Sequence, residues 1–176
     1  WDTRPGPPDD GRPPVAVSPR AQPARSAATM ATDRKFEATK VIYTRHTIDP
    51  DGAPQHLAQQ LINLMVFSTE KKLKTAGQPF AVYHKRDADE IDVQFCLPVE
   101  AAVECGDKEA VKYEEIAAFD GKSIVVDGPP TGWQAGYDKV EAAAGQALPK
   151  YEVYVKGAKD KAKPADFKTE LIIPNK

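Results

Sequence analysis

The last two-thirds of the chain repeats one pattern of elements twice, over residues of about 36–98 and 110–174. Each copy reads as a β-branched strand, an amphipathic helix and two further strands, the first of which carries aromatic residues. The landmarks are residues 41–43, 57–73, 80–83 and 93–98 in the first copy, and residues 124–126, 133–148, 151–154 and 171–174 in the second. A duplicated unit predicts one pseudo-symmetric domain, and ligands often bind where two such halves meet.

Start and stop signals place the helix of each copy. In the first copy Asp51 is the expected cap, Pro54 suits the first turn, and Gly77 predicts a stop after Ala76. In the second copy residues 131–134 have the form of a capping box, a hydroxyl followed three residues later by Gln. The apolar residues of both helices recur at helical spacing, which predicts that one stripe of each helix faces the sheet.

The segment between the copies is less regular. Residues 111–118 and 122–127 read as strand segments hinged at Asp120-Gly121, although the Ala and Glu content of residues 109–118 leaves a helix possible.

Composition bounds the class of protein. A chain of 176 residues with 41% hydrophobic content can build one ordinary core and hardly two. A formal charge of -2 gives no electrostatic reason to expect nucleic acid, and no apolar stretch approaches the about 18 residues of a membrane span. Cys96 and Cys105 lack metal-ligand spacing, so the sequence predicts no metal and no other cofactor, and a reducing, cytoplasmic setting fits best.

Residues 1–35 differ from the rest because they hold seven of the sixteen prolines and one aromatic residue. Such a segment cannot bury enough apolar surface to offset its ordering entropy, so we expect it to be disordered. It is too rich in proline to form a helix-turn-helix, and Met30 resembles an ordinary protein start.

Glu152 is the leading candidate for chemistry. Aligning the repeats places Ala81 with Glu152 and Tyr83 with Tyr154, so the carboxylate occurs in only one half. Strand alternation puts Glu152 and Tyr154 on one face and Tyr151 on the other, and if the helices cover the Tyr151 face, Glu152 lies on the concave side. A carboxylate among aromatic rings would have a raised pKa, and would favour a cation or act as a general base. The alternative is a solvated or Lys-paired strand residue.

Aromatic residues could wall such a pocket. Trp133 and Tyr137 are one helical turn apart and could hold a cation over their faces, and Tyr83, Phe95 and Tyr154 are further candidate ligand-binding residues. Core packing explains the same residues equally simply.

A series of segments resembles the GyrI-like effector-binding domain, which is also found fused to DNA-binding domains in multidrug-sensing transcription regulators. The segments are Ile91-Asp92-Val93 leading to Leu97-Pro98-Val99, Gly128-Pro129 before a helix, Tyr151-Glu152-Val153-Tyr154 and Thr169-Glu170-Leu171-Ile172-Ile173-Pro174. Two places depart from the family pattern: Asp127 and Pro130 flank the Gly-Pro where the family often has His and an aromatic residue, and residues 49–52 replace a Gly-Pro-Tyr turn.

The resemblance implies an α+β fold of duplicated β-α-β-β modules, in which a pseudo-symmetric antiparallel sheet carries two helices with a pocket between them. It implies binding of lipophilic and often cationic compounds, and Glu152 occupies the position of the ligand-sensing glutamate. Some stand-alone relatives are hydrolases of electrophilic small molecules, and some inhibit a topoisomerase.

The sequence therefore predicts a stand-alone small-molecule-binding domain over residues 36–176, with no membrane and no direct nucleic-acid contact. The expected partner is a small amphiphilic or electrophilic ligand held at Glu152. A hydrolase that uses Glu152 and a protein-interaction inhibitor of a topoisomerase stay as alternatives, with a related haem-binding fold as a distant fourth.

Overall fold

The computed structural model of the protein describes residues 30–129, 134–145, 148–157 and 160–175. The strands are β1 (Thr32–Phe36), β2 (Thr39–Ile48), β3 (Phe80–Arg86), β4 (Ile91–Pro98), β5 (Lys112–Ile116), β6 (Phe119–Asp127), β7 (Lys150–Lys156) and β8 (Lys168–Pro174). The helices are α1 (Ala53–Glu70) and α2 (Gln134–Ala144), with short 3-10 turns η1 (Pro50–Gly52) and η4 (Pro164–Asp166).

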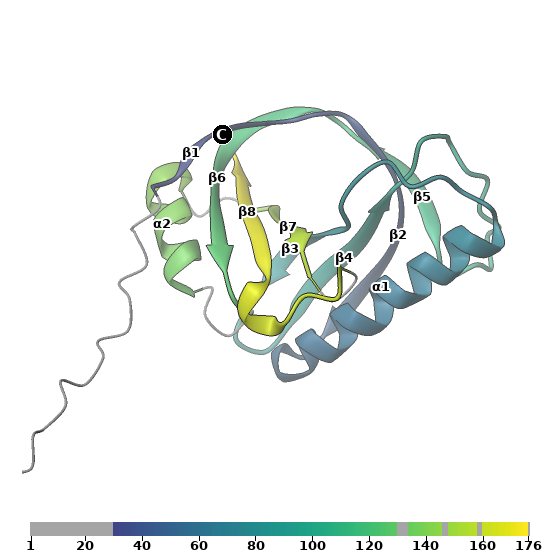
Figure 1. Ribbon diagram of the computed structural model, residues 1–176, viewed down its shortest axis with the longest axis horizontal. Helices are drawn as coiled ribbons and strands as arrows, with labels where there is room; N and C mark the ends of the chain where they lie inside the picture. The colour runs from purple at the N-terminus through teal and green to yellow at the C-terminus, as the bar shows by residue number, and fades with distance from the viewer. Residues whose placement is uncertain (1–29, 130–133, 146–147, 158–159, 176) are drawn as a thin grey trace, which may run out of the picture.

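The eight strands form one antiparallel sheet in the order β1-β6-β8-β7-β3-β4-β2-β5. The sheet curls into a half-barrel, with α1 along one side and α2 along the other (Figure 1). Each β-α-β-β module contributes one half, and β3 and β7 join the two halves at the centre. The predicted fold class of duplicated modules around a pseudo-symmetric antiparallel sheet is confirmed.

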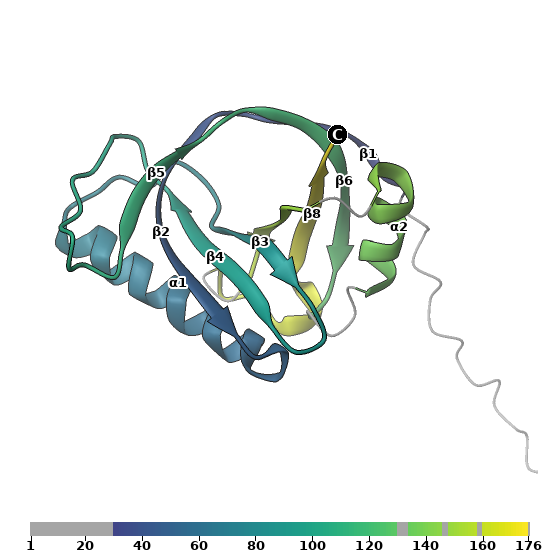
Figure 2. The same cartoon turned by 180° about the vertical axis from the view of Figure 1, so that it is seen from behind.

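The strand that opens each module also reaches into the other module. β1 is followed in the chain by β2 but pairs with β6, and β5 is followed by β6 but pairs with β2. Seen from behind, these extended stretches form the arch of the half-barrel (Figure 2).

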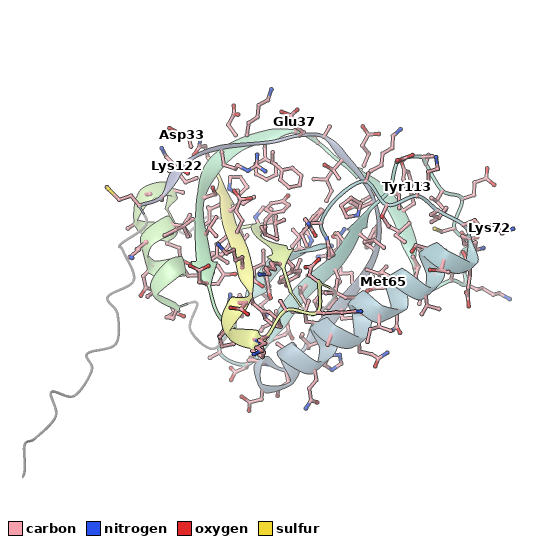
Figure 3. All side chains as sticks on the ribbon, in the orientation of Figure 1. Asp33, Glu37, Met65, Lys72, Tyr113 and Lys122 are labelled. Carbon is pink, nitrogen blue, oxygen red and sulfur yellow. The ribbon has the colours of Figure 1, made fainter. Side chains whose placement is uncertain are left out.

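β1 corrects the expected boundary of the disordered segment, because residues 32–35 are paired in the sheet. Asp33 lies opposite Lys122, and their side chains form an ion pair at 2.6 Å (Figure 3). Phe36 anchors the end of the strand by stacking on Phe119, with ring centroids 4.8 Å apart. Residues 1–29 lie outside the described residues, so their disorder stays a prediction.

The register at the centre of the sheet supports the alignment of the two repeats. Ala81 pairs with Glu152, and on either side Phe80 pairs with Val153 and Val82 with Tyr151. The pseudo-two-fold axis therefore passes between Ala81 and Glu152, which relates Phe80 to Tyr151 as the alignment requires.

The two faces of the sheet have separate cores. The face covered by the helices carries a large hydrophobic cluster that includes Leu64 of α1, Val140 of α2 and Leu171 of β8. The opposite face carries a smaller aromatic cluster around Phe80 and Tyr151. Because Tyr151 points away from the helices, Glu152 lies on the helix-covered face, so the condition that the helices cover the Tyr151 face is not met.

The ends of α1 differ from those that the sequence predicts. Asp51 does not cap α1: the N-cap of α1 is Gly52, which makes no side-chain capping hydrogen bond. Asp51 lies within the preceding turn η1, which Asp49 caps by accepting the Asp51 backbone N–H at 2.8 Å. The helix ends at Glu70 instead of near Ala76. The reason is tertiary, since residues 74–76 run beside the end of β4, where the Ala76 N–H donates to the Pro98 carbonyl at 3.0 Å.

Close packing constrains two glycines. A Cβ at Gly121 of β6 would lie 2.5 Å from the carbonyl oxygen of Ile173 on β8, and the expected hinge there is replaced by a break at residues 117–118. A Cβ at Gly136 of α2 would collide with Val126, so this glycine lets α2 lie close on the sheet.

The predicted capping box before α2 lies outside the described residues. In the part of the chain that the structure describes, neither helix combines the length and the apolar character that crossing a bilayer requires.

Candidate functional site

The carboxylate of Glu152 lies at the centre of a buried cluster of tyrosines. The residue is 2% exposed. Oε2 accepts hydrogen bonds from the hydroxyls of Tyr83 at 2.9 Å and Tyr154 at 3.1 Å, and Oε1 accepts one from the hydroxyl of Tyr137. A buried carboxylate needs such partners, because an unpaired charge in an apolar interior is strongly disfavoured.

Three elements bring this cluster together. Tyr83 comes from β3 of the first module, Tyr154 from β7 of the second, and the pseudo-two-fold axis relates the two positions. Tyr137 comes down from α2, which can approach the sheet closely because Gly136 has no side chain. Of the residues predicted to bind a ligand, these three and Glu152 form one connected group.

Burial dominates the electrostatics of the group. It raises the pKa of Glu152 above the ordinary value, although the Tyr137 hydrogen bond and the nearby Arg86 charge both act in the opposite direction. Burial and then the negative charge of Glu152 raise the pKa of the Tyr83 hydroxyl well above its ordinary value. The tyrosines are therefore neutral hydrogen-bond donors throughout the physiological pH range.

Arg86 brings a cation to the cluster. Its guanidinium Nη1 lies 3.6 Å from Oε1 of Glu152. Its central carbon lies 4.6 Å from the ring centroid of Tyr137 and 5.3 Å from that of Tyr83, within the range of cation–π attraction. The site therefore combines one carboxylate, three phenol hydroxyls and one guanidinium that rests on two aromatic rings.

A β-bulge places Arg86 on this face. The pairing of β3 with β4 runs from Tyr83 opposite Val93 to Lys85 opposite Asp92 and Arg86 opposite Ile91, so one extra residue is inserted at His84. Without that insertion, alternation would put Lys85 on the face of Tyr83. The bulge exchanges the two side chains, as bulges beside functional sites commonly do. Sequence reasoning missed Arg86 because a regular two-residue alternation hides it.

The two modules differ at the positions that carry charge. The repeat alignment that makes Ala81 equivalent to Glu152 also makes Arg86 equivalent to Gly157. Like β3, β7 has a register shift just before this position, after Tyr154. The first module thus supplies the cation, Arg86, and has Ala81 where the second module has Glu152. The second module supplies this anion and has Gly157 in place of the cation.

The remaining predicted ligand-binding residues lie outside this group. Phe95 of β4 is buried on the same face as Glu152, but Ala81 lies between them in the sheet. Trp133 lies outside the described residues. A further basic residue, Lys150, forms an ion pair with Glu141 of α2 and has its Nζ 5.7 Å from the Tyr137 ring centroid.

Comparisons with known proteins define the fold. No protein-family model and no curated protein match the sequence. Among solved structures, the C-terminal domain of EcmrR is similar with a TM-score of 0.68 at 20% identity, over 84% of this chain and 98% of that domain. The EcmrR chain in its DNA complex is similar with a TM-score of 0.69 at 19% identity over 83% of this chain, which spans only 57% of EcmrR.

Two further structures extend the comparison. SAV2435, solved bound to tetraphenylphosphonium, has a TM-score of 0.53 at 14% identity, with 83% of this chain and 93% of that chain covered. A hydrolase from Listeria innocua has a TM-score of 0.55 at 13% identity, with 84% and 93% covered. The chain therefore has the GyrI-like effector-binding fold that the resemblance implied.

Proposed function

We propose that this protein captures small lipophilic compounds that carry a cationic group, and that the cation lies on Glu152 at the seam between the two modules. The observation that supports this most directly is the buried Glu152 carboxylate beside the Tyr83 and Tyr137 rings, where the chain already holds one cation. A carboxylate with aromatic walls attracts a cation by charge and by the ring faces together.

The fold comparison supports the same ligand class. SAV2435 was solved with tetraphenylphosphonium, a lipophilic cation, and shares the arrangement of strands and helices. In this chain the seam joins β3 to β7, with Glu152 at the pairing closest to the pseudo-two-fold axis. Proteins with duplicated halves often bind ligands at such a seam.

The test is thermal unfolding of the full chain with tetraphenylphosphonium and with triphenylphosphine oxide as its neutral counterpart. A ligand that binds the native state raises stability by mass action, by about 2.7 kcal/mol at one hundred times its Kd. We expect the cation to stabilise the wild type, and Glu152→Gln to lose that effect. Glu90→Gln, which changes an exposed glutamate paired with Lys85, is the control and should respond like the wild type. Equal responses of wild type and Glu152→Gln would contradict the proposal.

A hydrolase is the second candidate, favoured by the raised pKa of Glu152 and by the fold shared with the Listeria innocua hydrolase. Glu152 would act as a general base or be alkylated by an electrophile. Incubation with small epoxides, followed by product analysis, distinguishes the two functions: a hydrolase forms product and Glu152→Gln abolishes the rate, whereas a binding protein forms none.

A protein-interaction role, such as topoisomerase inhibition, requires that changes at Glu152 have no effect. The surface to test would then be the exposed apolar side of α1, where Ile62, Met65 and Val66 are 46–54% exposed.

We also propose a cytoplasmic location, since Cys96 and Cys105 are both unpaired thiols, as is usual in a reducing compartment.

A further inference from the structure

The candidate site is closed by one of its own side chains. Glu152 is 2% exposed, whereas the Arg86 side chain is 38% exposed and lies over the cluster from the end of β3. An external cation that approaches Oε1 of Glu152 must compete with the guanidinium, whose Nη1 already lies 3.6 Å away.

The guanidinium is held in a way that permits its release. Its separation of 3.6 Å from Glu152 exceeds hydrogen-bond distance, so Arg86 is held by charge, by the two ring faces and by a side-chain contact with the Tyr137 hydroxyl. Arg86 is also the last residue of its strand, and a turn follows, in which the Asp87 N–H donates to the Glu90 carbonyl at 2.9 Å. Its side chain can therefore swing outward without breaking the hydrogen-bonded ladder of the sheet.

Comparison of the two modules shows that the Arg86 cation occurs in only one of them. The equivalent position in the second module is Gly157, and no described atom lies within 4 Å of a Cβ built there. The bulge at His84 turns Arg86 toward the one carboxylate at the seam.

We propose that Arg86 is a tethered competitor that occupies the cation position of the site, and that the preferred ligands are planar, delocalised cations that replace its guanidinium between Tyr83 and Tyr137. This inference rests on the proposed function of the Glu152 site. A planar amidinium reproduces both the flat stacking surface and the charge of guanidinium, whereas an alkylammonium is a compact, strongly hydrated point charge. Because of this competition, the apparent affinity equals the intrinsic affinity multiplied by the fraction of time for which Arg86 leaves the position open.

The first test compares benzamidinium with benzylammonium by titration calorimetry at pH 8. We expect the wild type to bind benzamidinium more tightly than benzylammonium, and Arg86→Met to bind benzamidinium about tenfold more tightly than the wild type, as follows if Arg86 occupies the position about nine-tenths of the time. Lys85→Met is the matched control, because Lys85 is adjacent in sequence but faces away from the cluster and pairs with Glu90. Its affinity should equal that of the wild type.

The second test uses the wild type alone, so it does not depend on the folding of a variant. In a side-chain ¹H–¹⁵N spectrum, saturation with benzamidinium should move the Arg86 Nε signal to the position of a solvated arginine. An unmoved signal, or an Arg86→Met variant that binds benzamidinium no better than the wild type, overturns the tethered competitor. If tetraphenylphosphonium still stabilises the wild type through Glu152 in that case, the proposed function survives. If neither protein binds any cation, both proposals fail.

Discussion

Ala81 of β3 and Glu152 of β7 lie directly opposite each other where the two modules meet, so the seam carries a methyl group on one side and a carboxylate on the other. The pseudo-two-fold axis passes between these two equivalent positions, yet one carries a charge and the other does not. The small Ala81 side chain leaves space for the Glu152 carboxylate to gather hydroxyl donors from both halves.

The pH dependence of stability should report the burial of Glu152. Its pKa is raised in the folded protein above the ordinary 4.5, so the folded state holds the proton more tightly than the unfolded state. The stability contributed by Glu152 is therefore greatest below about pH 4.5 and is lost as the pH rises through the folded pKa. We expect the difference in Tm between wild type and Glu152→Gln to fall across this window and then level off. Thermal unfolding of both proteins between pH 4.5 and 8 measures it, and a difference that rises with pH would show the assignment to be wrong.

Cation binding should have the opposite dependence on pH. A cation prefers the ionised carboxylate, so the affinity for tetraphenylphosphonium should increase as the pH rises through the folded pKa of Glu152 and then reach a plateau. Titration calorimetry at a series of pH values provides the measurement. An affinity that is independent of pH would mean that the ligand does not contact this carboxylate.

The hydroxyl of Tyr137 should contribute strongly to stability. Tyr137→Phe removes a buried donor to a carboxylate, and hydrogen bonds to charged groups contribute about 1.5–3 kcal/mol. Tyr151→Phe is the matched control: Tyr151 is also buried and neighbours Glu152 in the chain, but it points into the aromatic cluster on the opposite face. We expect a loss below about 1 kcal/mol for that change. Urea unfolding compares the two variants, and equal losses would refute a special role for the Tyr137 contact.

Gly136→Ala should displace α2 from the sheet. The added methyl group meets Val126 and Leu171, and overpacking of this kind costs about 1–3 kcal/mol. Because Tyr137 is the next residue, its hydrogen bond to Glu152 should weaken, which the near-ultraviolet circular dichroism of the tyrosines would report. Ala142→Gly on the exposed side of the same helix should lose about 1 kcal/mol through helix propensity and leave that spectrum unchanged.

Gly121→Ala should destabilise the pairing of β6 with β8. The new Cβ would lie 2.5 Å from the Ile173 carbonyl oxygen, which belongs to the backbone and cannot rotate away. We expect a loss of about 1–3 kcal/mol. At Gly77 the nearest atom to an added Cβ is Cγ of Pro98 at 3.7 Å, an ordinary contact, so Gly77→Ala should change stability by less than about 0.5 kcal/mol. Chemical denaturation that ranks the two variants in the reverse order would contradict this.

The sequence predicted the relationships that depend on periodicity. Repeat alignment made Ala81 the equivalent of Glu152, and the register of β3 with β7 agrees with that alignment. Strand alternation put Glu152 and Tyr154 on one face, as the structure shows. Alternation indicates which residues share a face, but it does not indicate which face the helices cover. The structure answers that question through Tyr137, which reaches Glu152 from α2.

Features that interrupt periodicity could not be predicted. The bulge at His84 reverses the faces of Lys85 and Arg86, and nothing in the run of residues marks the inserted position. The early end of α1 at Glu70 has a similar cause, because residues 74–76 gain hydrogen bonds beside β4 that outweigh their helix propensity.

The exchange of β1 and β5 between the modules makes the two repeats interdependent. If the chain were divided between the repeats, the first fragment would keep β1 but lose β6, the strand with which β1 pairs. The second fragment would either lack β5 or keep it without β2, the strand with which β5 pairs. Each fragment would expose an unpaired sheet edge. The duplication visible in the sequence is therefore no longer a pair of separable folding units, and the two halves should unfold together as one cooperative body.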